Sequence, residues 1–222
     1  RSFEQLLDPR ETVALATASS LHETLPVESG VPRECRLALK LIDAETKQPL
    51  PGLVRIIGAS GRGIELPGLL SRGLKLRAGH PGKEWYVLTE PGVIAVPREQ
   101  LRIEAFSGLE TELAIATVDL RESSGRELVV PLQGFHSAAR LGWRSGNTHL
   151  HVRGMTRGQA DEYLRTLPTG DGVELVFVSY LARAKEDRDY ISNSYARADL
   201  EALSSSILRF GNGEEHRHNF GS

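Results

Sequence analysis

Apolar residues occupy every second position in the stretch that starts at Cys35, where Leu37, Leu39 and Leu41 follow it. Side chains of a β-strand point alternately to its two faces, so this spacing predicts a strand with one buried face. The proline- and glycine-punctuated residues 43–52 predict a turn into a returning strand. Further strands are predicted at residues 53–57, 85–88, 92–96, 101–106, 114–120 and 126–132, and a long glycine-rich loop at 58–82. Short strands separated by turn signals indicate an antiparallel β-sandwich over residues 33–135.

After residue 135 the pattern changes to alternating strands and helices. Strands are predicted at residues 148–152, 173–178 and 207–210, and helices at 156–167 and 197–206, with Thr156 as the N-cap of the first helix. This order is typical of a parallel α/β unit. We therefore predict an α+β protein of two domains: a leading segment at residues 1–32, the sandwich at 33–135, and the opening strands and helices of a (β/α) barrel at 136–222.

Composition narrows the possible partners. The 222 residues include 27 Lys and Arg against 29 Asp and Glu, a net charge of −2, which gives no global basic field for nucleic acid or an anionic membrane. The sequence contains no stretch of 18 consecutive apolar residues, so it predicts no membrane span. The single cysteine, Cys35, leaves histidine, aspartate and glutamate as the metal ligands. The start at Arg1 is compatible with a cleaved signal peptide, so the compartment stays open, with an extracytoplasmic location favoured.

Four of the seven histidines fall at the ends of two predicted strands. His149 and His151 alternate on one strand, so both imidazoles point to the same face and can meet one metal ion. His216 and His218 repeat this spacing after the third strand. The carboxyl ends of neighbouring parallel strands share one rim, where such folds place their sites. This gathering of histidines at one rim predicts a metal or phosphate site. Residues 214–218 are also compatible with a solvated polar end of the chain.

Residues 141–151, Leu-Gly-Trp-Arg-Ser-Gly-Asn-Thr-His-Leu-His, closely resemble the motif that opens CehA/McbA-type metallohydrolases. These enzymes are a branch of the polymerase-and-histidinol-phosphatase (PHP) superfamily. Residues 171–181, 190–195 and 213–220 are also similar to a subgroup of that branch. The sequence departs from the pattern at Asn147, where the family usually has aspartate, and at Ser179-Tyr180, where many members have an Asp-His pair.

The resemblance implies a distorted (β/α) barrel preceded by a prealbumin-like sandwich, similar to carboxypeptidase regulatory domains. It also implies a divalent metal ion, either zinc, manganese or iron. The ligands carried over by position are His149, His151 and Glu215, with His216 and His218 as candidates specific to the subgroup.

Two functions follow as hypotheses. The first is a hydrolase whose metal-activated water attacks an ester, amide or phosphoester of a small-molecule substrate. In that hypothesis Arg217 holds an anionic group, and Asn193 and Tyr195 line the pocket. The second is a catalytically inactive structural or binding protein in which the sandwich mediates assembly. Possible partners are the remainder of the barrel, as a separate or cleaved chain, and further copies in a homo-oligomer.

Overall fold

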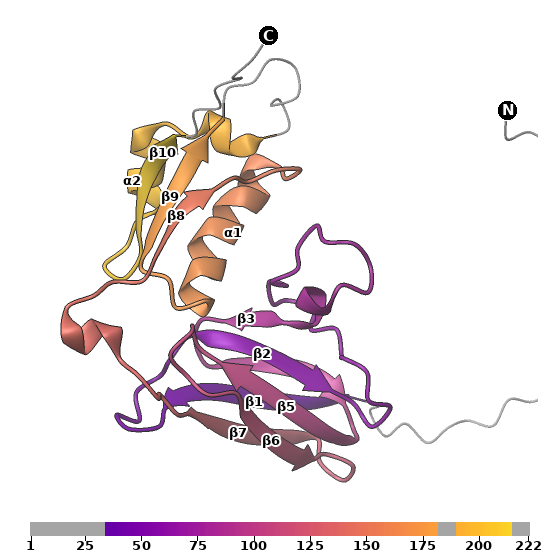
Figure 1. Ribbon diagram of the computed structural model, residues 1–222. Coiled ribbons are helices and arrows are strands. Elements are labelled where there is room, and N and C mark those ends of the chain that lie inside the picture. Colours follow the sequence, from indigo (N-terminus) through magenta and orange to yellow (C-terminus); the bar gives the residue numbers. More distant parts are fainter. Residues whose placement is uncertain (1–33, 182–189, 215–222) are drawn as a thin grey trace, which may run out of the picture. The chain divides into compact units, whose positions relative to one another are not determined.

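Two β-sheets face each other in the first half of the chain (Figure 1). The structure, a computed structural model, describes residues 34–181 and 190–214. One sheet has the order β4-β1-β7, with β1 at Glu34–Asp43, β4 at Gly92–Pro97 and β7 at Gly125–Leu132. The other has the order β3-β2-β5-β6, with β2 at Gly52–Ile57, β3 at Tyr86–Leu88, β5 at Gln100–Phe106 and β6 at Ala114–Asp119.

The alternating residues of β1 form the centre of the sandwich core. Cys35, Leu37, Leu39 and Leu41 are all buried, and they pack in one cluster with inward-facing residues of the second sheet such as Ile103. The predicted β-sandwich is therefore confirmed. Its predicted antiparallel pairing is wrong at one place, because β1 pairs with β7 in parallel, Arg36 opposite Gly125 and Asp43 opposite Leu132.

The second half contains a parallel sheet of three strands in the order β10-β9-β8. β8 spans Gly146–Leu150, β9 spans Leu175–Tyr180 and β10 spans Arg209–Glu214. The helices α1 (Arg157–Gly170) and α2 (Arg197–Leu203) supply Leu164 and Leu200 to the same apolar cluster as Val176 and Val178 of β9. The barrel expected here is not supported, because the described residues form an open sheet of three strands. None of the helices in the described ranges is long and apolar enough to cross a membrane.

The first helix begins where the sequence predicts. The Thr156 hydroxyl accepts a hydrogen bond from the Gln159 amide, and the Gln159 side chain accepts one from the Thr156 amide, which forms a capping box. The helix continues three residues beyond the predicted end, to Gly170, because Leu167 and Pro168 are buried.

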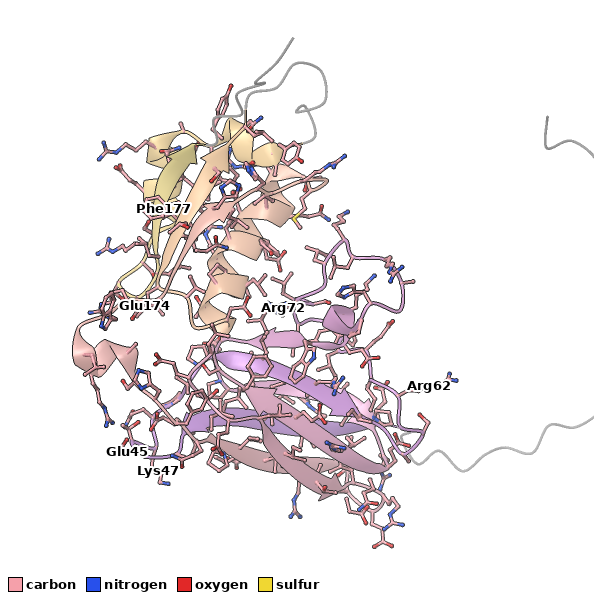
Figure 2. The ribbon with its side chains drawn as sticks, in the orientation of Figure 1. Glu45, Lys47, Arg62, Arg72, Glu174 and Phe177 are labelled. Atoms are coloured by element: carbon pink, nitrogen blue, oxygen red, sulfur yellow. The ribbon has the colours of Figure 1, made fainter. Side chains whose placement is uncertain are left out.

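The end of α1 packs on the outer face of the four-stranded sheet. Leu167 joins Leu53 of β2 and Val87 of β3 in a small buried cluster. Arg72, labelled in Figure 2, lies near this end of the helix, and its Nε donates to Asp171 Oδ1 over 3.0 Å. Burial of these apolar side chains and the Arg72 ion pair hold the parallel sheet and the sandwich together, and the described residues of both form one compact unit.

Candidate functional site

The carboxyl ends of β8 and β10 lie at the same edge of the parallel sheet, one on each side of β9 (Figure 1). Leu150 at the end of β8 pairs with Val178, and Glu214 at the end of β10 pairs with Tyr180. The predicted strand ends are thus brought to one rim. Glu215, His216, Arg217 and His218 lie outside the described residues, so their roles stay predictions.

His149 and His151 meet at this rim. Leu150 and Val152 pack against the apolar cluster beneath the helices, so the alternation of the chain turns both histidines away from it. Their Nε2 atoms lie 3.0 Å apart, and the ring planes cross at 79°. The Asn147 side chain accepts a hydrogen bond from the His149 amide over 3.0 Å, which fixes the backbone at the start of the pair.

This separation suits two ligands of one metal ion. Metal–nitrogen bonds of about 2.0–2.1 Å place two imidazole nitrogens about 2.9–3.4 Å apart when the angle at the metal is about 90–109°. The observed 3.0 Å falls in that interval, and it is also the distance of a direct hydrogen bond between the two imidazoles. Within the described ranges no third histidine, cysteine, aspartate or glutamate joins the pair. The described part of the rim therefore presents two imidazole nitrogens, and their role as metal ligands stays a prediction.

An aromatic ring lies against the pair. The ring centroids of His151 and Tyr190 are 5.6 Å apart in an edge-to-face arrangement, and the Arg153 guanidinium lies 5.5 Å from the Tyr190 centroid. A β-bridge between Arg153 and Tyr190 brings this second segment to the rim. Sequence analysis placed Tyr190 only within the similar segment 190–195 and assigned it no role, because its contact with His151 depends on tertiary structure.

Asn193 and Tyr195, predicted to line a substrate pocket, are engaged by neighbouring groups. The Asn193 side chain accepts from the Leu181 amide and donates to the Leu181 carbonyl, over 2.8 and 2.7 Å. The buried Tyr195 hydroxyl donates to Asp161 Oδ1 over 2.7 Å. Burial and this hydrogen bond raise the pKa of Tyr195 well above its usual range. These contacts tie the segment to α1 and β9, and the predicted role in binding stays a prediction.

A second candidate site is an exposed apolar surface around the connection between the sandwich and the parallel sheet. We call it the linker patch. It consists of Leu109 in the β5–β6 loop and of Phe135, Leu141 and Trp143 in the connection. Their exposed fractions are 93%, 63%, 67% and 70%. The Phe135 amide donates to the Glu110 carbonyl over 3.0 Å, which brings the connection beside the β5–β6 loop. Large apolar side chains exposed near one another on a protein surface mark sites of interaction.

The linker patch is held in a defined conformation. The Glu110 carboxylate accepts from the Ala138 amide over 3.0 Å, at the start of the short helix η2 (Ala138–Leu141). Arg140 donates to Glu45 over 2.7 Å, and Arg144 donates to Glu174 over 2.9 Å. Glu45 and Glu174, labelled in Figure 2, mark the two ends of the connection. No prediction from the sequence covered this patch, although Phe135 and Trp143, two aromatic residues in a segment without periodicity, were a signal for it.

Comparison with known proteins gives distant structural likenesses. No family model matches the chain. No curated protein matches it. A double mutant of the shaft pilin SpaA from Lactobacillus rhamnosus GG matches with 10% identity and a TM-score of 0.29, over 47% of this chain and 48% of the pilin chain. The C-terminal domain of the same pilin matches with 12% identity and a TM-score of 0.26, over 46% of this chain and 98% of that domain. This chain thus spans about half the length of the first pilin chain.

These findings correct the expected family. The expected match to CehA/McbA-type metallohydrolases of the PHP superfamily is wrong, because no family model and no curated protein supports it. The expected metallohydrolase and PHP domain are therefore wrong as well. The motif residues have local roles instead. Gly142 ends η2 in a left-handed conformation, with φ of 83°, and Trp143 is exposed.

Proposed function

We propose that this chain is a structural or binding protein that assembles with further copies of itself through the linker patch and the adjoining sandwich. The exposure of Phe135, Leu141 and Trp143 on a segment fixed by hydrogen bonds and ion pairs supports the proposal. Tryptophan and other large aromatic side chains supply much of the binding energy where proteins meet. Burial of such a side chain contributes about 1.5–3 kcal/mol, so the exposed side chains of this surface provide a driving force for contact between copies.

The double variant Phe135→Ser/Trp143→Ser tests this function. Each substitution removes an apolar side chain from the contact, and a loss of about 1.4 kcal/mol corresponds to a tenfold weaker association. We expect self-association to weaken about 100-fold, measured by analytical ultracentrifugation over a range of protein concentrations. Ile207→Ser is the matched control, because Ile207 is 61% exposed and lies in the turn before β10. A wild-type chain that stays monomeric throughout would contradict the proposal.

A second candidate function is the binding of a divalent metal ion by His149 and His151. The 3.0 Å separation of their Nε2 atoms favours it. Of the candidate ions zinc, manganese and iron, an imidazole pair favours zinc and iron, because manganese prefers oxygen ligands. A metal ion bound here would occupy the rim of the parallel sheet and would not change the linker patch.

Titration of the full chain with zinc or manganese tests the metal site. We expect one equivalent to bind, measured by isothermal titration calorimetry and checked by metal analysis after gel filtration. Retention of no metal after gel filtration, by a chain shown to be folded by circular dichroism, would count against this second function.

A further inference from the structure

A basic loop projects from the sandwich before β3. Residues 66–83 contain Arg72, Lys75, Arg77 and Lys83 and no aspartate or glutamate. Arg72 is engaged by Asp171. Lys75, Leu76 and Arg77 are exposed and follow one another at the end of the loop. We call these three residues the basic tip, which is an apolar side chain between two cations.

The base of this loop is rigid. Gly73 lies against the backbone of Lys83, so closely that a Cβ at Gly73 would come within 2.5 Å of the Lys83 nitrogen. The Ser71 hydroxyl donates to the Lys83 carbonyl over 3.0 Å. His80 Nδ1 accepts from the Gly82 amide over 3.0 Å. Compact loops closed at their base in this way are frequently functional.

The backbone of the tip is strained. Lys75 has a φ of 65°, a left-handed conformation that residues with a Cβ rarely adopt. Such conformations persist where the surrounding structure imposes them, and they gather at binding sites. The strain and the clamped base together present Lys75 and Arg77 in a fixed arrangement, which lowers the cost of ordering them on binding.

Two carboxylates lie beside the linker patch, whose own arginines, Arg140 and Arg144, are paired with Glu45 and Glu174. Leu109 is followed by Glu110 and Glu112, of which Glu112 is exposed, and the neighbouring Leu113 is half exposed. The basic tip combines leucine with cations, and the patch combines apolar residues with carboxylates. Two linker patches brought face to face would place carboxylates together, whereas a tip against a patch pairs opposite charges.

We infer that copies of this chain associate head to tail, with the basic tip of one copy seated on the linker patch of the next; this rests on the proposed self-association. Because the two surfaces differ, each copy keeps one free tip and one free patch after pairing. Contacts of this kind build rings or open chains rather than closed dimers. The contact depends on charge, so salt weakens it.

Complementation between two variants tests the inference. The tip variant Lys75→Glu/Arg77→Glu keeps its patch, and the patch variant Phe135→Ser/Trp143→Ser keeps its tip. We expect each variant alone to be monomeric and an equimolar mixture to form dimers that grow no further, measured by light scattering after gel filtration. Arg62→Glu/Arg126→Glu is the matched control, because both arginines are exposed and the change in charge is the same.

The outcomes distinguish a failure of the head-to-tail contact from a failure of self-association itself. A tip variant that associates like the wild type, or a mixture that stays monomeric while the wild type associates, overturns the head-to-tail contact and leaves self-association standing. A control variant that is as monomeric as the tip variant also overturns the head-to-tail contact, because the loss of association then follows from the change in net charge. A wild-type chain that is monomeric in low and high salt overturns both.

Discussion

Leu164→Ala is expected to lower the free energy of unfolding by about 3 kcal/mol. Leu164 is fully buried on α1 and packs in the cluster with Val176, Val178 and Leu200, behind the rim that carries the histidine pair. Replacement by alanine removes apolar contacts and leaves a cavity, because close-packed neighbours relax only partly into the space. The cluster between α1 and β9 supplies the main support of the rim.

Urea denaturation followed by circular dichroism measures the change in Leu164→Ala. Arg165→Ala is the control: Arg165 is the next residue of α1 and is exposed, so we expect its effect to stay within about 0.5 kcal/mol. Equal midpoints for the two variants would show that α1 contributes little to the stability of this half of the chain.

The sandwich could be predicted because an apolar residue at every second position of a strand indicates which of its faces is buried. Each inward residue from Cys35 to Leu41 is apolar, and all four are buried. The parallel pairing of β1 with β7 could not be predicted in the same way. Alternation along one strand states which face is buried, and it carries no information about which strand lies beside it or in which direction.

The third strand of the parallel sheet shows a different limit of prediction from the sequence, which concerns the length of a strand. β10 runs from Arg209 to Glu214, while the sequence predicted a strand at 207–210 only. Gly211 and Gly213 lowered the expected strand propensity. In the structure both glycines lie close against β9: a Cβ at Gly211 would lie 3.0 Å from the Phe177 ring, and one at Gly213 would lie 2.6 Å from the Ser179 hydroxyl. Such neighbours come from β9, which sequence pattern alone does not place alongside.

The two candidate sites differ in how much of each could be predicted from the sequence. The shared orientation of His149 and His151 followed from strand alternation, and their contact agrees with it. The linker patch could not be found in this way, since exposure of Phe135 and Trp143 depends on what the folded chain leaves uncovered. The family resemblance misled because a short motif carries local geometry, such as the left-handed Gly142, that other proteins also need.

His149→Ala and His151→Ala are each expected to weaken zinc binding about 100-fold or more. Loss of a residue that only supports a ligand costs about 10–100-fold in metal affinity, so loss of a ligand itself costs at least the upper part of that range. The remaining imidazole would have no histidine, cysteine, aspartate or glutamate within the described ranges to replace the lost nitrogen.

Competition with a chromophoric chelator measures the affinities of the two histidine variants. His136→Ala is the matched control, because His136 is exposed in the connection away from the rim, and its affinity should equal that of the wild type. Both rim variants should keep the far-ultraviolet circular dichroism of the wild type, since neither imidazole belongs to the apolar cluster under the sheet. If His136→Ala lost as much affinity as His149→Ala, zinc would be binding to histidines in general, and the 3.0 Å pair would have no special role.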